Sequence, residues 1–221
     1  MNKKTQSIFS LVAGCFAALV ALFYLIEAII ELTRIGNYGG DATLIVYAVL
    51  GILVSLCATA GMCFCGVKLI LNFTKGVDEP KFIKLIAVVF FAYHAVVGLL
   101  FFFFFIEGIE YFGVDIWLNL IVAIIGLVIA LIAVFAKFDD KVNPVFNIVV
   151  QVFGFVAAII FLALGAEGLG LAALIFNMLA FGVAVTYFIF DMILASKGGA
   201  TPAKVEEPKA EEEPAKEDSA E

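Results

Sequence analysis

Six long apolar runs constrain the fold of this chain more than any other feature. A helix that crosses a bilayer needs about 20 consecutive, predominantly apolar residues, and each run reaches about that length. The runs cover approximately residues 8–30, 43–67, 82–106, 116–136, 145–164 and 169–192. Because only helices and closed barrels satisfy their backbone groups in lipid, we predict an all-α fold, a polytopic membrane bundle of six transmembrane helices.

The composition supports this class and excludes others. Hydrophobic residues make up 64% of the chain and charged residues 15%, whereas soluble domains average about 45–50% and about 25%. The net charge of −7 argues against nucleic-acid binding, which needs a basic surface. The chain is therefore expected to have the lipid bilayer as its main environment and no nucleic-acid partner.

Several polar residues at the ends of the runs predict where helices begin. Asp41 and Asp115 precede or open the second and fourth runs, where a side-chain oxygen can cap a helix. Asn143 and Pro144 predict an N-cap followed by proline at the first helical position of the fifth helix. Pro80 similarly precedes the third helix.

The basic residues predict the orientation. If the chain crosses the membrane at each run, all of the 13 Lys and Arg residues except Arg34 fall on one side. Cytoplasmic loops carry such an excess, so both termini are predicted to be cytoplasmic, with the chain in the cell (plasma) membrane. Because the connections are short, we expect three antiparallel hairpins. The outer side is acidic and contains Glu27, Glu31, Asp41, Glu107, Glu110, Asp115 and Glu167.

The last 26 residues differ sharply from the rest. Residues 196–221 contain four Lys, eight Asp or Glu, three Pro and no aromatic residue. Such a segment cannot bury enough apolar area to fold. We predict a transmembrane domain over residues 1–195 and a disordered acidic cytoplasmic tail over residues 196–221, which could bind a cytoplasmic partner.

Motifs for catalysis or for metal binding are missing from the sequence. The single His cannot form a histidine metal cluster, and the chain lacks a P-loop, H-E-x-x-H or G-x-S-x-G motif. Cys63 and Cys65 are two positions apart, so on a helix they point about 200° apart and do not converge on a metal. We therefore expect no enzymatic activity, no metal and no cofactor.

Polar residues inside the apolar runs are the strongest candidates for a site, because they are costly in lipid. His94 lies about 12 residues, or about 18 Å, into the third run. It is either a proton acceptor or a neutral histidine bonded to a neighbouring helix, and we favour the second interpretation. The candidate intramembrane polar site comprises His94, Asn147, Gln151, Asn177, Tyr187 and Asp191.

The last two runs contain stripes of polar and small residues at helical spacing. Asn147 and Gln151 are expected at depths similar to those of Asp191 and Tyr187 in an antiparallel hairpin. Small residues let helices approach, and amides bond between them. We favour this structural interpretation, a tight seam, over a polar vestibule with Asp191 as an ion or proton site.

Three glutamates form a candidate outer acidic rim. Glu27, Glu107 and Glu167 lie near the ends of the odd runs, where carboxylates oppose the helix dipole. They either attract cations or are solvated surface charges, and we favour the second interpretation. For Glu31, an i,i+3 pair with Arg34 is expected.

Two functions from different classes remain. The favoured one is a non-catalytic membrane partner or accessory protein, which packs against another membrane protein or forms a homo-oligomer. The alternative is a small ion, proton or solute channel or transporter. No helix-breaking proline lies inside a run, which weighs against the broken helices common in transporters.

Overall fold

The computed structural model describes residues 3–77, 79–106, 108, 113–136, 138–139, 142–165 and 168–196, with only the backbone of Lys3, Lys4 and Ala195. These residues form six α-helices and a short 3₁₀ helix, η1 (Ile35–Asn37). The α-helices are α1 (Lys3–Arg34), α2 (Ala42–Lys75), α3 (Lys81–Phe104), α4 (Val114–Phe135), α5 (Val142–Ala163) and α6 (Gly168–Ser196). The part of the chain that the structure describes contains no strand.

All six α-helices are long and apolar enough to cross a membrane, which confirms the prediction of six such helices and indicates an integral membrane protein. The helices extend beyond several of the apolar runs. For example, α2 continues to Lys75, eight residues past the end expected from the apolar pattern. Lysine is a good helix former, so a helix need not end where its apolar residues end.

The helix starts match the sequence predictions in part. The Asp41 side chain caps α2 as predicted, since it accepts hydrogen bonds from the backbone N–H groups of Thr43 and Leu44 at 2.9 and 3.2 Å. The prediction for Asp115 was wrong, because Gly113 is the N-cap of α4. Asp115 instead lies in the first turn, where its carboxylate interacts favourably with the helix dipole.

The predicted cap of α5 was also wrong. This helix begins at Val142, so Asn143 lies inside its first turn. The Asn143 side-chain oxygen accepts hydrogen bonds from Lys84 and Asn147 instead of from the backbone of its own helix. Tertiary contacts thus determine the role of this residue.

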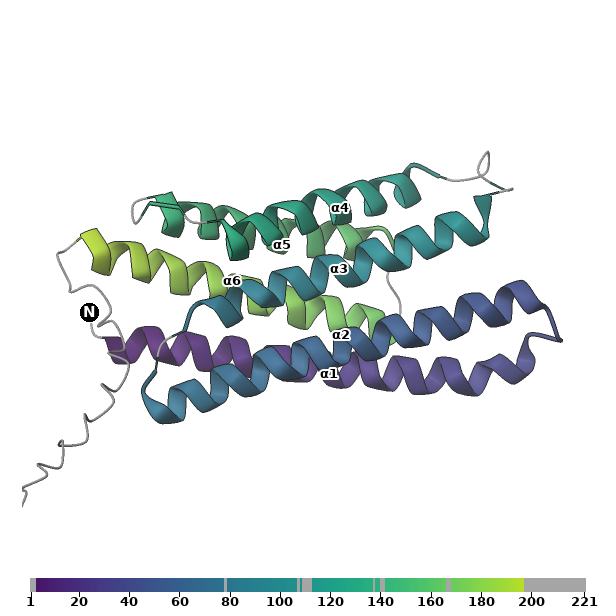
Figure 1. The fold of residues 1–221 in the computed structure, drawn as a ribbon, viewed down its shortest axis with the longest axis horizontal. Helices are drawn as coiled ribbons and strands as arrows, with labels where there is room; N and C mark the ends of the chain where they lie inside the picture. Colours follow the sequence, from purple (N-terminus) through teal and green to yellow (C-terminus); the bar gives the residue numbers. More distant parts are fainter. Residues whose placement is uncertain are drawn as a thin grey trace, which may run out of the picture.

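Consecutive helices run in opposite directions along one long axis (Figure 1). We call the end that contains the starts of the odd-numbered helices the proximal end, at the left of Figure 1, and the other the distal end. The helix α3 contacts each of the other five helices, and α1 packs extensively against both α2 and α6. The first and last helices therefore lie side by side, with α6 ending at the proximal end where α1 begins.

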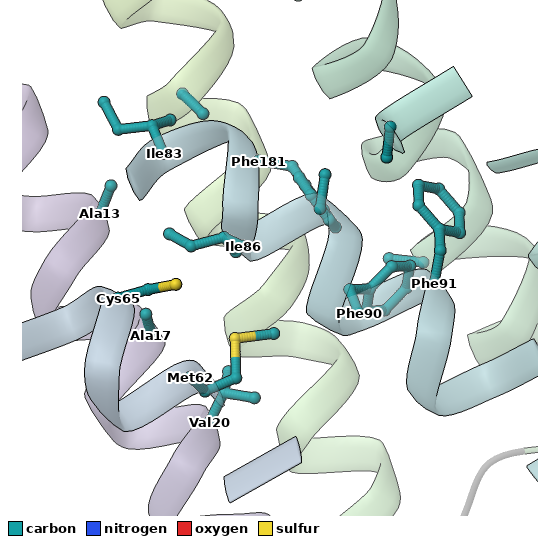
Figure 2. Packing of buried hydrophobic residues seen from close by; sticks show 14 of the residues in the cluster. Ala13, Ala17, Val20, Met62, Cys65, Ile83, Ile86, Phe90, Phe91 and Phe181 are labelled. Carbon is teal, nitrogen blue, oxygen red and sulfur yellow. The ribbon is translucent and has the colours of Figure 1, made fainter. Parts of the chain in front are cut away.

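The core consists of small residues on α1 and large aromatic residues on α3 and α6 (Figure 2). Ala13 and Ala17 are fully buried one turn apart on α1. Phe90, Phe91 and Phe181 are also fully buried, and the Phe90 and Phe181 rings meet edge to face with centroids 5.0 Å apart. Aromatic rings thus fill the middle of the bundle around α3.

The backbones of α1 and α2 touch at a pair of glycines. A Cβ atom on Gly66 would lie 2.8 Å from the backbone oxygen of Gly14 and 3.1 Å from the backbone nitrogen of Ala18. A Cβ atom on Gly14 would lie 2.8 Å from the Cβ of Leu69. Small residues at membrane helix interfaces permit this close approach, which maximises van der Waals contact in the absence of a hydrophobic driving force.

The outward faces of the helices are apolar. Leu53, Leu56, Phe64, Ile121, Ile125 and Val128 are among the large hydrophobic side chains that are exposed. Apolar surface of this extent is incompatible with water. It fits an integral membrane protein, in which such exposed side chains contact lipid instead of water.

Candidate functional site

Buried and half-buried polar side chains at the proximal end of the bundle form hydrogen bonds across helices. Gln6 of α1 donates from Nε2 to Oδ1 of Asp191 on α6, at 3.1 Å. Lys84 of α3 donates from Nζ to Oδ1 of Asn143 on α5, at 3.2 Å, and Asn147 donates from Nδ2 to the same oxygen at 3.1 Å. We call these five residues the proximal cluster.

Lys84 connects three helices within this cluster. Its Nζ also donates to the backbone oxygen of Ala133 at 3.2 Å. This carbonyl belongs to the last turn of α4, where no amide of the same helix is available to it. Lys84 also interacts electrostatically with Asp191. A positive charge at a helix C-terminus is favourable. The hydrogen bonds at the proximal end thus join α3 to α4 and α5, and α1 to α6.

A second group of polar residues lies in the distal half, and we call it the distal cluster. Asn177 of α6 is fully buried and donates from Nδ2 to the hydroxyl of Tyr24 on α1 at 3.4 Å. The Tyr24 and Tyr93 rings have centroids 4.4 Å apart. The Tyr93 hydroxyl donates to Oε2 of Glu27 at 3.5 Å and also bonds to Ser55 of α2. The cluster therefore connects α1, α2, α3 and α6.

A cavity of about 220 Å³ adjoins the distal cluster between α1, α2 and α3. We call it the Glu27 cavity. Its polar wall contains Glu27, Glu31, Ser55, Tyr47 and Tyr93. The other wall is apolar or small, with Ala28, Ala48, Gly51, Ile52, Val97 and Leu100. On α2 the lining extends from Tyr47 to Ser55, or about 12 Å along the helix.

The two glutamates of this cavity have different partners. Glu31 accepts a hydrogen bond from the Tyr38 hydroxyl, and its other oxygen lies 3.7 Å from Nη1 of Arg34, which confirms the expected i,i+3 pair. The hydrogen bond to Glu31 raises the pKa of Tyr38, which lies beyond the end of α1. Glu27 has no cationic partner among the described residues, and its hydrogen bond from Tyr93 is long at 3.5 Å.

His94 lines a second cavity of about 190 Å³, which the chain forms between α2, α3 and α4. The two cavities share Tyr47 and Val97. The imidazole ring packs against Phe90 and Phe161, with centroids 4.8 and 4.4 Å away. Its Nε2 is buried and has no hydrogen-bond partner among the described residues. The expected bond to a neighbouring helix is therefore not made through this nitrogen.

Gln151 is the most isolated of the predicted polar residues. It is fully buried, and neither its Nε2 nor its Oε1 has a hydrogen-bond partner in the part of the chain that the structure describes. The α5–α6 seam is nevertheless tight, because a Cβ atom on Gly154 would lie 2.7–2.9 Å from the Phe181 ring. Tyr187 is buried on α6 with its ring edge to face with Phe188. Close packing thus joins the two helices here.

The structure distributes the predicted site residues over different places. Asn147 and Asp191 belong to the proximal cluster, whereas Asn177 and Glu27 belong to the distal cluster. His94 lies beside a cavity, and the Gln151 side chain has no hydrogen-bond partner among the described residues. The other two rim residues, Glu107 and Glu167, lie outside the described residues, as does residue 197 onward of the tail.

Sequence reasoning missed Gln6, Lys84, Tyr24, Ser55 and Tyr93. Lys84 and Gln6 each lie near the start of an apolar run, so a search for polar residues in the middle of the runs does not find them. Tyr24 and Tyr93 are apolar in bulk, so they do not stand out in a hydropathy pattern, although each hydroxyl must find a partner when buried. An inventory of all hydroxyl groups inside the runs would have found these two tyrosines.

The described residues contain no group of three or more His, Cys, Asp or Glu side chains that could hold a metal ion. All four cysteines are free, and Cys65 is buried whereas Cys63 is exposed. Comparisons with known protein families, with curated proteins and with solved structures find no match to this chain.

Proposed function

We propose that this integral membrane protein is a non-catalytic partner or accessory protein within the bilayer. The observation that carries the proposal is the use of the buried polar groups. The bonds Gln6–Asp191, Lys84–Asn143 and Asn177–Tyr24 each join two different helices. Polar groups that bond between helices hold the helices together, and the buried rings of Phe90 and Phe181 pack edge to face in the core. These features suit a protein whose task is to present surfaces, including its acidic tail.

The proposed topology places the proximal end in the cytoplasm. The lysine excess supports this orientation, since Lys68, Lys75, Lys81 and Lys84 all belong to the proximal ends of α2 and α3. In this arrangement three antiparallel hairpins cross the plasma membrane. The acidic tail, which we propose to be disordered, then follows α6 into the cytoplasm and is available to a cytoplasmic partner.

Cysteine labelling in intact cells tests this topology. We expect a membrane-impermeant maleimide to label Asn37→Cys directly and Lys75→Cys only after permeabilisation. Both positions are exposed: Asn37 is the last residue of η1, just before the distal start of α2, and Lys75 is the last residue of α2 at the proximal end. The background variant replaces Cys15, Cys57, Cys63 and Cys65 with alanine and provides the control for label at native thiols. Labelling of Lys75→Cys in intact cells would contradict the proposed orientation.

A flux assay tests the functional class. We expect liposomes that contain the purified chain to pass protons, sodium and potassium no faster than empty liposomes, measured with a pH-sensitive dye and ion-selective electrodes. Flux that is abolished by His94→Ala together with Asp191→Asn would instead establish transport.

A truncation tests the role of the tail. We expect truncation after Ser196 to remove a cross-linked cytoplasmic partner from the purified protein.

Transport is the second candidate because several buried polar atoms of the described residues, on His94, Asn147, Gln151 and Asn177, have no hydrogen-bond partner there. Gln151 and the Nε2 of His94 are buried near the middle of the bundle, where such groups are costly. Water or a translocated ion would satisfy them. The same flux assay decides between the two candidates.

A further inference from the structure

We propose that the Glu27 cavity binds a small organic ammonium ion. This inference goes beyond the proposed function and does not depend on it, since a binding site is compatible with either functional class. It rests on the charge, the aromatic lining and the size of the cavity, together with the unpartnered polar group beside it.

The charge of Glu27 is the first argument. The carboxylate lies within α1, half-buried against the cavity, and no described cation pairs with it. Arg34, the basic residue that follows on α1, pairs with Glu31 instead. A partly buried carboxylate is stabilised when a cation or hydrogen-bond donors compensate it. A bound cation would supply the charge that this cavity lacks.

The lining selects the class of cation. Tyr47 and Tyr93 place two aromatic rings at the cavity, and aromatic faces attract ammonium groups. The remaining wall is formed by side chains such as Ile52, Val97 and Leu100, which suit the methyl groups of an organic ion. A calcium ion prefers 6–8 oxygen ligands, whereas the described residues provide no cluster of three acidic or metal-binding side chains. The chemistry therefore favours an alkylammonium ion over a metal ion.

The volume sets the size of the ligand. At about 220 Å³, the cavity is smaller than the roughly 300–1,000 Å³ typical of sites for drug-sized ligands. The adjoining cavity of about 190 Å³ shares Tyr47 and Val97 with it and is lined by His94, whose buried Nε2 has no described partner. A small ammonium group beside Glu27 thus fits the first cavity.

The experiment is a calorimetric titration of the full-length protein in detergent with tetramethylammonium chloride. We expect saturable binding to the wild type and at least about tenfold weaker binding to Glu27→Gln, because the neutral amide keeps the shape but loses the charge-assisted interaction. The matched control is Glu79→Gln, which removes a carboxylate that pairs with Lys81 at the proximal end. This control variant should bind like the wild type.

A second variant fills the cavity and leaves the charge in place. Gly51 lines the cavity, and a Cβ atom added there meets no atom within 4 Å. We expect Gly51→Val to fold and to weaken tetramethylammonium binding, so the proposal stays testable if Glu27→Gln fails to fold. Absence of saturable binding to the wild type, or unchanged binding to Gly51→Val, would overturn the proposal. So would equally tight binding of sodium, potassium or calcium chloride, because the aromatic and apolar lining would then have no role.

Discussion

Replacing Gly66 with valine is expected to separate α1 from α2 and to destabilise the folded protein by about 1–3 kcal/mol, the usual cost of overpacking. The added Cβ would lie 2.8 Å from the backbone oxygen of Gly14 and 3.1 Å from the backbone nitrogen of Ala18. These are backbone atoms, so rotation of a side chain cannot relieve the contact. The measurement is the temperature at which the purified protein loses its monodisperse peak in size-exclusion chromatography.

The same substitution at Gly51 of α2 provides the control. It has the same effect on helix propensity, but the position is open and nothing within 4 Å obstructs an added Cβ. We expect Gly51→Val to keep a stability close to that of the wild type. Equal losses of stability in the two variants would show that valine weakens α2 itself. The close approach of the α1 and α2 backbones at Gly66 would then not be the cause of the loss.

Replacing Gln151 with methionine is expected to stabilise the protein by about 1–3 kcal/mol, the cost of an unsatisfied buried polar group. The Gln151 amide is fully buried and unpartnered on both atoms among the described residues. Methionine has a similar length and flexibility, so the packing against α6 is largely kept. Thermal denaturation in detergent, followed by circular dichroism, measures the change.

Asn177 provides the matched comparison. It is equally buried, and its Oδ1 also lacks a partner among the described residues, but its Nδ2 donates to the backbone oxygen of Ala173 and to the hydroxyl of Tyr24. We expect Asn177→Leu to destabilise the protein, because it leaves the Tyr24 hydroxyl without this partner. If Gln151→Met is destabilising by a similar amount, water or another group must satisfy the Gln151 amide, which would favour the transport candidate.

The outcome for Gln151 and Asn177 shows how much of the site could be predicted. Helical spacing correctly identified both as buried polar residues, since such residues stand out in an apolar run. Their partners could not be predicted, because Asn177 bonds to Tyr24, a residue of the first helix. The same holds for Asp191, which accepts a hydrogen bond from Gln6, also a residue of the first helix. A pattern within one helix carries no information on which distant helix faces it.

The sequence by itself determined the class of this protein. Six runs of about 20 apolar residues leave no other fold than membrane-spanning helices, because the backbone must satisfy its hydrogen bonds without water. The capping of α2 by Asp41 could also be predicted from the sequence, since it depends only on residues two and three positions further along the chain. Charge asymmetry added a topology that labelling can test.

Only the tertiary structure decided what the polar residues do. Placing α1 between α2 and α6 brings Gln6 to Asp191, and central placement of α3 brings Lys84 to the end of α4. The Glu27 cavity likewise depends on the packing, because residues of three different helices line it. The physical reason is that lipid solvates one apolar helix about as well as another. The neighbours of each helix are therefore selected by the shape of its surface and by a few hydrogen bonds. Those features become visible only when the helices are packed together.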